Sequence, residues 1–370
     1  LIPFVHFAEA TVQVRRREDK DNAGDSRTVQ SWGGMRAVFA EIYRRYDDLG
    51  EHDIREARKV VLAAEHPSKA KVNFQPAVDH MRWLAGHALT EADAEVLARR
   101  LVAWPQQPQI TLVVLASQAQ GPLLAKTLDS LQLQLYKQWR LIVVADFAAP
   151  DPLFENSEVL GWLQVDHVDH FDDTAKLFNA VLAEVGMDWG MLLPCGAELE
   201  PHALLRLADR VVRDPNCLAL YCDHDSVAMR GYEQPQFKPA FDLDMLLAYD
   251  YIGASVLLRA DAVQHLGGLQ PYEGFEVYQL LLNLAAHFGA AAIANLPELL
   301  LHLPARDGKL AMRKLAVEDW LQASATQARV ELGLAEQTLR VVYPLTAQPQ
   351  VSIIIPSRNA FEFIEPCINT

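Results

Sequence analysis

The chain has 370 residues, of which 51% are hydrophobic, and it carries a formal net charge of −15 at pH 7. Its length predicts two or three domains with sizeable cores, and the negative charge excludes nucleic-acid binding through phosphates and a polybasic membrane patch. No apolar run approaches the ~18 residues that a membrane span needs. No secretory signal pattern is present, and the four cysteines form no CxxC pair, so we expect a cytoplasmic protein with reduced thiols.

Residues 1–104 show helical periodicity without a catalytic pattern. We expect four helices, at about 34–50, 54–64, 76–88 and 91–102. Thr90 should cap the last of these, with Asp93 completing a capping box. The histidines of this region lack a metal-ligand spacing. The region is therefore predicted to be a small all-α docking or spacer domain.

After a hinge at residues 104–108, the pattern changes to alternating strands and helices. Apolar runs at 110–115 and 141–144 flank a helical stretch at 122–133, which predicts a mostly parallel sheet with helices on both faces. Further strands are expected within 154–168 and at 190–193, 218–221 and 255–259, and a further helix at 173–185. The fold class is thus predicted to be α/β, preceded by the helical domain.

Two carboxylates follow the predicted strand 218–221 directly. Asp223 and Asp225 would lie at its carboxyl end, where open α/β sheets bind ligands. Two carboxylates one residue apart can hold a divalent cation or hydrogen-bond a ribose. A solvated Asx turn is the alternative, and the spacing alone leaves both open.

Five segments around this pair follow one another in a fixed order. They are 221–225, 237–247, 250–253, 255–259 and 267–268. This order resembles the family 2 glycosyltransferases with a GT-A fold, in the bacterial branch that builds O-antigen and related surface glycans. The resemblance covers about residues 109–370 and implies a Rossmann-like, mostly parallel sheet flanked by helices.

The resemblance also implies roles for individual polar residues. In the family, the matching positions hold the nucleotide sugar, and here they are Asp146, Lys176, Asn179, Asp223 and Asp225. Active members transfer a hexosyl or deoxyhexosyl group with the help of Mn²⁺ or Mg²⁺.

The chain departs from the family at four places. The carboxylates that hold the metal are replaced by the sequence Pro-Cys-Gly-Ala at 194–197, which supplies no hard oxygen ligand. The family's catalytic base is replaced by Val277, with Glu276 as a weak stand-in. The base-binding motif of the first strand and the family's His-Trp-Arg are altered at 115–118 and 302–304. We therefore expect no bound metal in this module, and no catalytic residue unless Glu276 takes the place of the base.

Near its end, the chain shows the start of a repeat. Periodicity predicts one long helix over 312–332 and a strand over 339–343. Residues 351–359 then repeat the opening of the first α/β domain, which predicts a second, truncated GT-A domain. The predicted organisation is a helical domain (1–104), a degenerate GT-A domain (109–303), a long helix and linker (304–350) and the start of a second GT-A domain (351–370).

These features predict a degenerate module of a larger bacterial glycan-assembling glycosyltransferase. It would act as a scaffold, or bind an acceptor glycan or a partner, while a second domain of the same polypeptide supplies Mn²⁺- or Mg²⁺-dependent activity. Its expected partners are that domain, a nucleotide sugar and the acceptor glycan. We expect the protein in the cytoplasm or peripherally at the inner face of the inner membrane. The alternative is an active nucleotide-sugar-dependent transferase that uses Asp223 and Asp225, and a third, weaker reading is a regulatory nucleotide-binding module.

Overall fold

The computed structural model describes residues 76–87, 90–152, 154, 157–168, 174–228, 231–305, 308–345, 347, 352–355 and 361–369. The helices expected at 34–50 and 54–64 lie outside these residues. Internal contacts divide the chain into two units, Leu1–His87 and Ala88–Thr370. The limits of the four predicted domains stay predictions.

In the first unit, helix α4 (Pro76–Gly86) forms where the sequence predicts a helix. The Trp83 ring stacks on His87, with ring centroids 4.1 Å apart. The Nδ1 atom of His87 lies 2.7 Å from the carbonyl oxygen of Trp83. These contacts join residues one helical turn apart, as expected for the end of a helix.

Helix α5 (Glu91–Val102) begins the second unit, and its start is the predicted capping box. The Asp93 N–H donates to Thr90 Oγ1 at 3.2 Å, and the Thr90 N–H donates to Asp93 Oδ2 at 3.1 Å. Leu97 is buried in the same core cluster as strands of the α/β domain. A helix that the sequence groups with the N-terminal domain therefore contributes to the α/β core.

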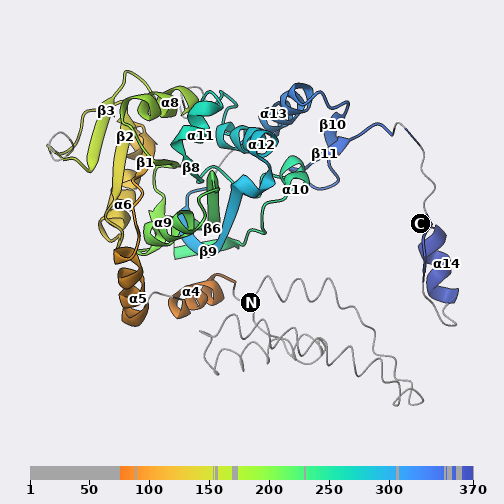
Figure 1. The fold of residues 1–370 in the computed structure, drawn as a ribbon, viewed down its shortest axis with the longest axis horizontal. Helices are drawn as coiled ribbons and strands as arrows, with labels where there is room; N and C mark the ends of the chain where they lie inside the picture. The colour runs from red at the N-terminus through yellow and green to blue at the C-terminus, as the bar shows by residue number, and fades with distance from the viewer. Residues whose placement is uncertain are drawn as a thin grey trace, which may run out of the picture. The chain divides into compact units, whose positions relative to one another are not determined.

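A nine-stranded mixed sheet forms the centre of the second unit, in the order β3-β2-β1-β4-β8-β6-β9-β5, with β7 paired to β6. The strands are β1 (Ile110–Ala116), β2 (Trp139–Ala145), β3 (Leu160–Gln164), β4 (Trp189–Leu193), β5 (Glu198–Leu199), β6 (Ala219–Ala228), β7 (Gly231–Gln236), β8 (Leu257–Arg259) and β9 (Ile293–Leu303). Strand β1 pairs in parallel with β2 and β4, and β2 pairs in parallel with β3 (Figure 1). The prediction that residues 110–115 and 141–144 share one parallel sheet is confirmed.

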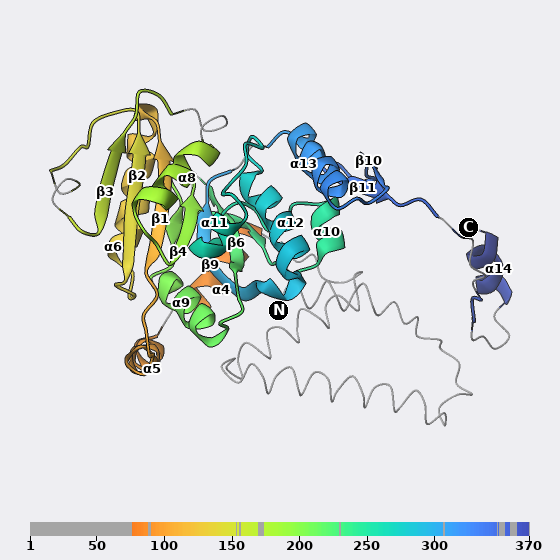
Figure 2. The same cartoon turned by 45° about the horizontal axis from the view of Figure 1, so that its top comes forward.

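Helices cover both faces of this sheet, so the α/β class is also confirmed. They are α6 (Gly121–Gln132), α8 (Thr174–Glu184), α9 (Ala203–Arg213), α10 (Leu243–Ala248), α11 (Ala260–His265), α12 (Glu276–Phe288) and α13 (Leu310–Ala323). One core cluster contains residues of α8, α11, α12 and α13, and the other contains residues of α5, α6 and α9. Figure 2 shows these helices around the sheet. Strand β1 is buried throughout because it contributes to both clusters. Within the described part of the chain, no helix is long and apolar enough to cross a membrane.

Strand β6 differs from its prediction. It continues past Tyr221 to Ala228 and pairs with β7, so Asp223 and Asp225 lie within a strand and not in a turn after it. The pairing of β6 with β9 shifts its register next to Asp223, which accommodates the longer strand. The predicted strand end was wrong because partners distant in sequence satisfy both carboxylates.

The long helix predicted over 312–332 is also wrong. Helix α13 ends at Ala323, and Ala325 has a φ of 51°, a left-handed conformation that stops a helix. Strands β10 (Arg329–Leu332) and β11 (Leu339–Val342) then form an antiparallel pair. In β10, Val330 is buried while its neighbours Arg329 and Glu331 are more exposed, as expected for a strand that covers a core on one face.

The described residues near the end of the chain do not contain the strand predicted to open a second domain. Residues 352–355 have no regular structure, and Ile353 and Ile354 are 81% and 89% exposed. Helix α14 (Phe361–Asn369) lies beyond them. The existence of a second GT-A domain therefore stays a prediction.

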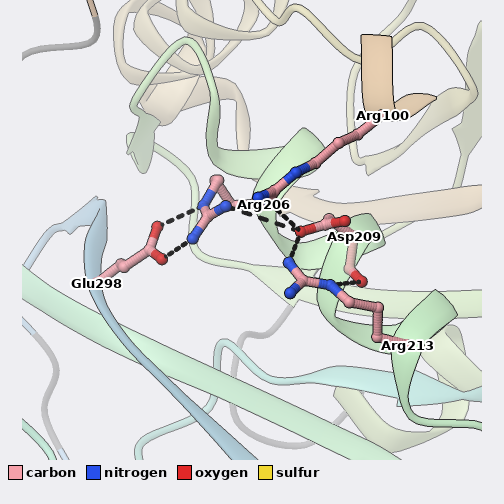
Figure 3. Close-up of polar contacts among 5 residues, drawn as sticks. All are labelled: Arg100, Arg206, Asp209, Arg213 and Glu298. Carbon is pink, nitrogen blue, oxygen red and sulfur yellow. Dashed lines mark hydrogen bonds and ion pairs between the residues drawn. The ribbon is translucent and has the colours of Figure 1, made fainter. Parts of the chain in front are cut away.

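A buried carboxylate on α9 connects α5 to the sheet (Figure 3). Asp209 is 2% exposed, pairs with Arg213, and lies 3.7 Å from Arg100 of α5 and 3.7 Å from Arg206. Arg206 also makes a two-pronged contact with Glu298 of β9, with Nε donating to Oε2 at 2.8 Å. A buried charge of this kind is stable only while its partners are in place.

We expect Asp209→Asn to lower the free energy of unfolding by about 3 kcal/mol, because it leaves the surrounding guanidinium groups without their shared counter-charge. The loss should lie at the low end for a broken buried ion pair, since Arg100 and Arg213 are half-exposed and can be hydrated. Urea unfolding followed by circular dichroism measures it. Glu184→Gln, an exposed change on α8, is the matched control, and equal unfolding midpoints for the two variants would contradict this role.

Candidate functional site

The carboxyl ends of β1, β2 and β4 meet at one edge of the sheet, because the three strands are parallel. Asp146 follows β2 at this edge. Its Oδ1 accepts the N–H of Gln118 at 2.8 Å. Gln118 begins the short 3-10 helix η2 (Gln118–Gln120) after β1. The carboxylate predicted to bind a nucleotide therefore joins the loops after two neighbouring strands.

The loop at residues 194–197 follows β4 at the same edge, and it is fastened to α6. The Gly196 N–H donates to Thr127 Oγ1 at 3.1 Å, and Cys195 Sγ lies 3.6 Å from the carbonyl oxygen of Gln120. Cys195 and Ala197 are buried in the core cluster that α6 covers. The loop thus packs its side chains into the core.

Residues of this type and conformation do not fit a hard divalent cation. Gly196 has a φ of +93°, and a Cβ there would lie 3.3 Å from the Cβ of Leu123, so a carboxylate side chain would be strained at this position. Burial raises the pKa of the Cys195 thiol to about 11, which keeps it protonated at neutral pH. Mn²⁺ and Mg²⁺ prefer oxygen ligands, and this loop offers no side-chain oxygen.

The side-chain amide of Asn179 is used to hold a backbone segment. Its Oδ1 accepts the N–H of Leu269 and its Nδ2 donates to the Leu269 carbonyl oxygen, both at 2.8 Å. A Cβ on Gly268 would lie 2.5 Å from Asn179 Oδ1, so only glycine allows this close approach. Lys176, on the same helix α8, is exposed.

Asp223 belongs to a buried hydrogen-bonded group that connects β6 to the segments that follow it. Its Oδ1 accepts the Lys238 N–H at 2.8 Å, and Lys238 Nζ donates to the Ile252 carbonyl oxygen at 2.7 Å. The ammonium group also lies 5.9 Å from the centre of the Tyr221 ring. Burial raises the pKa of Asp223 to about 6, although the hydrogen bond and charge of Lys238 lower it, and burial lowers the pKa of Lys238.

Asp225 belongs to a separate cluster, centred on His302. The Nδ1 of His302 lies 2.6 Å from Asp225 Oδ1, and its Nε2 lies 3.1 Å from Glu200 Oε1. The Tyr232 ring stacks on the imidazole, with centroids 3.6 Å apart and planes 7° apart, and its hydroxyl donates to Glu198 at 2.9 Å. Asp223 and Asp225 therefore serve two different partners and do not converge on one ligand.

The His302 ring is positively charged at neutral pH. Burial by itself would lower its pKa, but the hydrogen bonds and charges of Asp225 and Glu200 raise the pKa to about 9. The hydrogen bond from His302 lowers the pKa of Glu200 below its ordinary value. Within the part of the chain that the structure describes, no three His, Cys, Asp or Glu side chains are arranged to hold a metal ion.

This cluster forms one wall of a pocket of about 390 Å³, which we call the α6 pocket. On one side lie Glu198 of β5, Glu200 directly after β5, Tyr232 of β7 and His302 of β9. On the other side lie Lys126, Asp129 and Ser130 of α6 and Leu133, which follows that helix. The sequence did not predict this site. The spacing of Glu198 and Glu200, two residues apart, was the only sequence signal for this site. The charges come together because Asp225 pairs with His302 across β6 and β9.

Glu276, the weak candidate base, is the first residue of α12 and is 3% exposed. Its Oε1 accepts the N–H of Gly274 at 3.0 Å. Val277, which stands where the family has an aspartate, is buried in the core. The role of Glu276 stays a prediction, as do the nucleotide-sugar roles of the other residues.

No protein-family model matches the chain. It is 26% identical over 313 residues to the O-antigen biosynthesis protein RfbC of Myxococcus xanthus, across 79% of this chain and 24% of that protein. It is 23% identical over 341 residues to the uncharacterized protein y4gI of Sinorhizobium fredii, across 83% of this chain and 37% of that protein. The chain thus spans well under half the length of either relative.

Among solved structures, the chain is similar to S. aureus TarS (residues 1–349). The structure in complex with UDP has a TM-score of 0.43 and 13% identity, over 58% of this chain and 70% of that one. The structure in complex with UDP-GlcNAc has a TM-score of 0.44 and 13% identity, over 58% of this chain and 66% of that one.

The charged His302 makes the stability of the fold depend on pH. Its pKa rises from 6.5 to about 9 on folding, so the native protein keeps a proton that the unfolded chain releases between these values. We expect the contribution of His302 to the free energy of unfolding to be fully present below pH 6.5 and to fall by up to about 3 kcal/mol as the pH rises to 9. Urea unfolding at a series of pH values measures this.

His302→Gln is the control for this pH dependence, because it cannot take up the proton. The decline between pH 6.5 and 9 should largely disappear in this variant. An equal decline in the parent and in His302→Gln would show that His302 is not the group responsible.

Proposed function

We propose that this chain is a glycosyltransferase family 2-like module of a larger bacterial glycan-assembling glycosyltransferase, and that the module itself is non-catalytic. It serves as a scaffold, or as the part that binds an acceptor glycan or a partner domain. The similarity to the O-antigen biosynthesis protein RfbC across 79% of the chain supports the glycan setting. The five ordered sequence segments support the choice of a GT-A fold.

The single observation that carries the non-catalytic reading is the loop at residues 194–197. Glycosyltransferases that use Mn²⁺ or Mg²⁺ need carboxylates to hold the ion against the leaving diphosphate. Here, Cys195 and Ala197 are buried, Gly196 is bonded to Thr127, and Cys195 carries a protonated thiol. This loop supplies no group that could neutralise a diphosphate.

Three other polar groups of the predicted site are engaged within the fold, whereas Lys176 is exposed. Asp146 accepts a backbone N–H from Gln118, Asn179 bonds Leu269 at both ends of its amide, and Asp223 accepts the N–H of Lys238. Each contact stabilises the protein itself, which supports a structural use of positions that an active relative would devote to its substrate. Fold alone would not license this inference, because one fold hosts many activities.

The rest of the proposal concerns the longer polypeptide. A second GT-A domain, beginning near residue 351, would hold Mn²⁺ or Mg²⁺ and transfer a hexosyl or deoxyhexosyl group. The present module would meet that domain, the acceptor glycan and at most a nucleotide sugar. We propose a cytoplasmic protein, either free or peripheral at the inner face of the bacterial inner membrane.

Purified protein of residues 1–370 should neither transfer sugar nor hydrolyse UDP-, GDP- or dTDP-sugars above the enzyme-free rate, with or without Mn²⁺. Release of nucleoside diphosphate, measured by chromatography, gives the readout. The physical reason is that no metal and no placed base act on the donor.

Metal-dependent turnover by this protein would contradict the proposal. Asp223→Asn then decides whether the alternative holds, because asparagine can still accept the Lys238 N–H but cannot bind a cation as a carboxylate does. Turnover that is lost in Asp223→Asn and kept in the surface control Glu184→Gln would establish an active transferase that uses Asp223.

A further inference from the structure

The α6 pocket gives the proposed module a binding site of its own. We propose that the α6 pocket binds a neutral, hydroxyl-rich sugar residue of a glycan, and that the module holds its acceptor there. This inference rests on the proposed function and adds the site and the class of ligand. None of the residues predicted to contact a nucleotide sugar lines this pocket.

The wall formed by the strands is fixed before any ligand arrives. The Tyr232 ring lies flat against His302, and its hydroxyl is bonded to Glu198. His302 in turn is held at both nitrogens, by Asp225 and Glu200. Because these side chains are already ordered, binding would cost little conformational entropy in the protein.

The charges around the α6 pocket select against other ligands. The carboxylates of Asp129, Glu198 and Glu200 outnumber the ammonium group of Lys126 and the imidazolium of His302. A phosphate or nucleoside diphosphate would therefore meet net negative charge. A metal ion would face Lys126 and His302, and the described residues contain no set of three His, Cys, Asp or Glu side chains suited to hold one.

A sugar satisfies the hydrogen-bonding groups that remain. Glu198 uses Oε2 for Tyr232, and Glu200 uses Oε1 for His302, so each keeps a second oxygen that can accept from a hydroxyl. Lys126 can donate to a hydroxyl or ring oxygen. Leu133, 65% exposed at the pocket, offers an apolar surface for the C–H face of a sugar ring.

The size of the pocket agrees with this ligand class. Its volume of about 390 Å³ lies in the range of small-molecule sites, roughly 300–1,000 Å³. Asp129 and Lys126 are exposed, so a sugar can enter without displacing the core.

Saturation-transfer NMR and calorimetry on residues 1–370 test the proposal with D-glucose, D-galactose, L-rhamnose and N-acetyl-D-glucosamine as probes. We expect at least one of them to bind with a Kd of about 1–10 mM, so that about 50 mM approaches saturation. Asp129→Asn and Glu198→Gln should each weaken binding about tenfold, which corresponds to about 1.4 kcal/mol. Asp129 is exposed, so its variant tests the pocket without risk to the fold, and Glu184→Gln should bind as the parent does.

The proposal would be overturned if none of the four sugars bound, or if Asp129→Asn and Glu198→Gln left the binding unchanged. Inorganic phosphate or UDP that displaced a bound sugar would also overturn it, because the site would then be one for anions. Failure here is distinguishable from failure of the proposed function. If the protein binds no sugar and shows no turnover, only the proposed role of the α6 pocket is overturned. If it binds sugar and also shows turnover, only the proposal that the module is non-catalytic is overturned.

Discussion

A buried charge must find a partner inside the protein, and this constraint shapes the second half of the sheet. Strand β6 carries Asp223 and Asp225 into the interior, where they are 4% and 0% exposed. The shifts in register beside Asp223 allow one carboxylate to meet Lys238 and the other to meet His302. The same residues that resemble a ligand-binding motif thus become the ties that hold β6, β9 and the loops after β7 together.

The loop after β4 is also held within the protein, but its buried groups are apolar and not charged. At the sheet edge, Cys195 and Ala197 extend the core, and Gly196 allows close contact with α6. The segment after the loop is held to α6 as well, since Gln134 Nε2 donates to the Glu200 carbonyl oxygen at 2.9 Å. Fixing α6 against β5 in this way also forms the α6 pocket.

Local patterns predicted those parts of the fold that local forces determine. The Thr90–Asp93 capping box and the parallel pairing of β1 with β2 are confirmed because a cap and a fully apolar run need little knowledge of the rest. The end of α13 and the length of β6 depended on contacts between distant segments, and the predictions failed there. His302 was read only as part of an altered motif, because its neighbours Asp225 and Glu200 lie 77 and 102 residues away.

We propose that Asp146, Asn179, Asp223 and Asp225 serve the fold and not a metal-bound donor. Calorimetric titration of residues 1–370 with UDP-, GDP- and dTDP-sugars, each with and without Mn²⁺, tests it most directly. We expect a Kd weaker than about 1 mM for every donor and no change on adding Mn²⁺. Affinity that rises about tenfold or more with Mn²⁺, by roughly 1.4 kcal/mol, would contradict it.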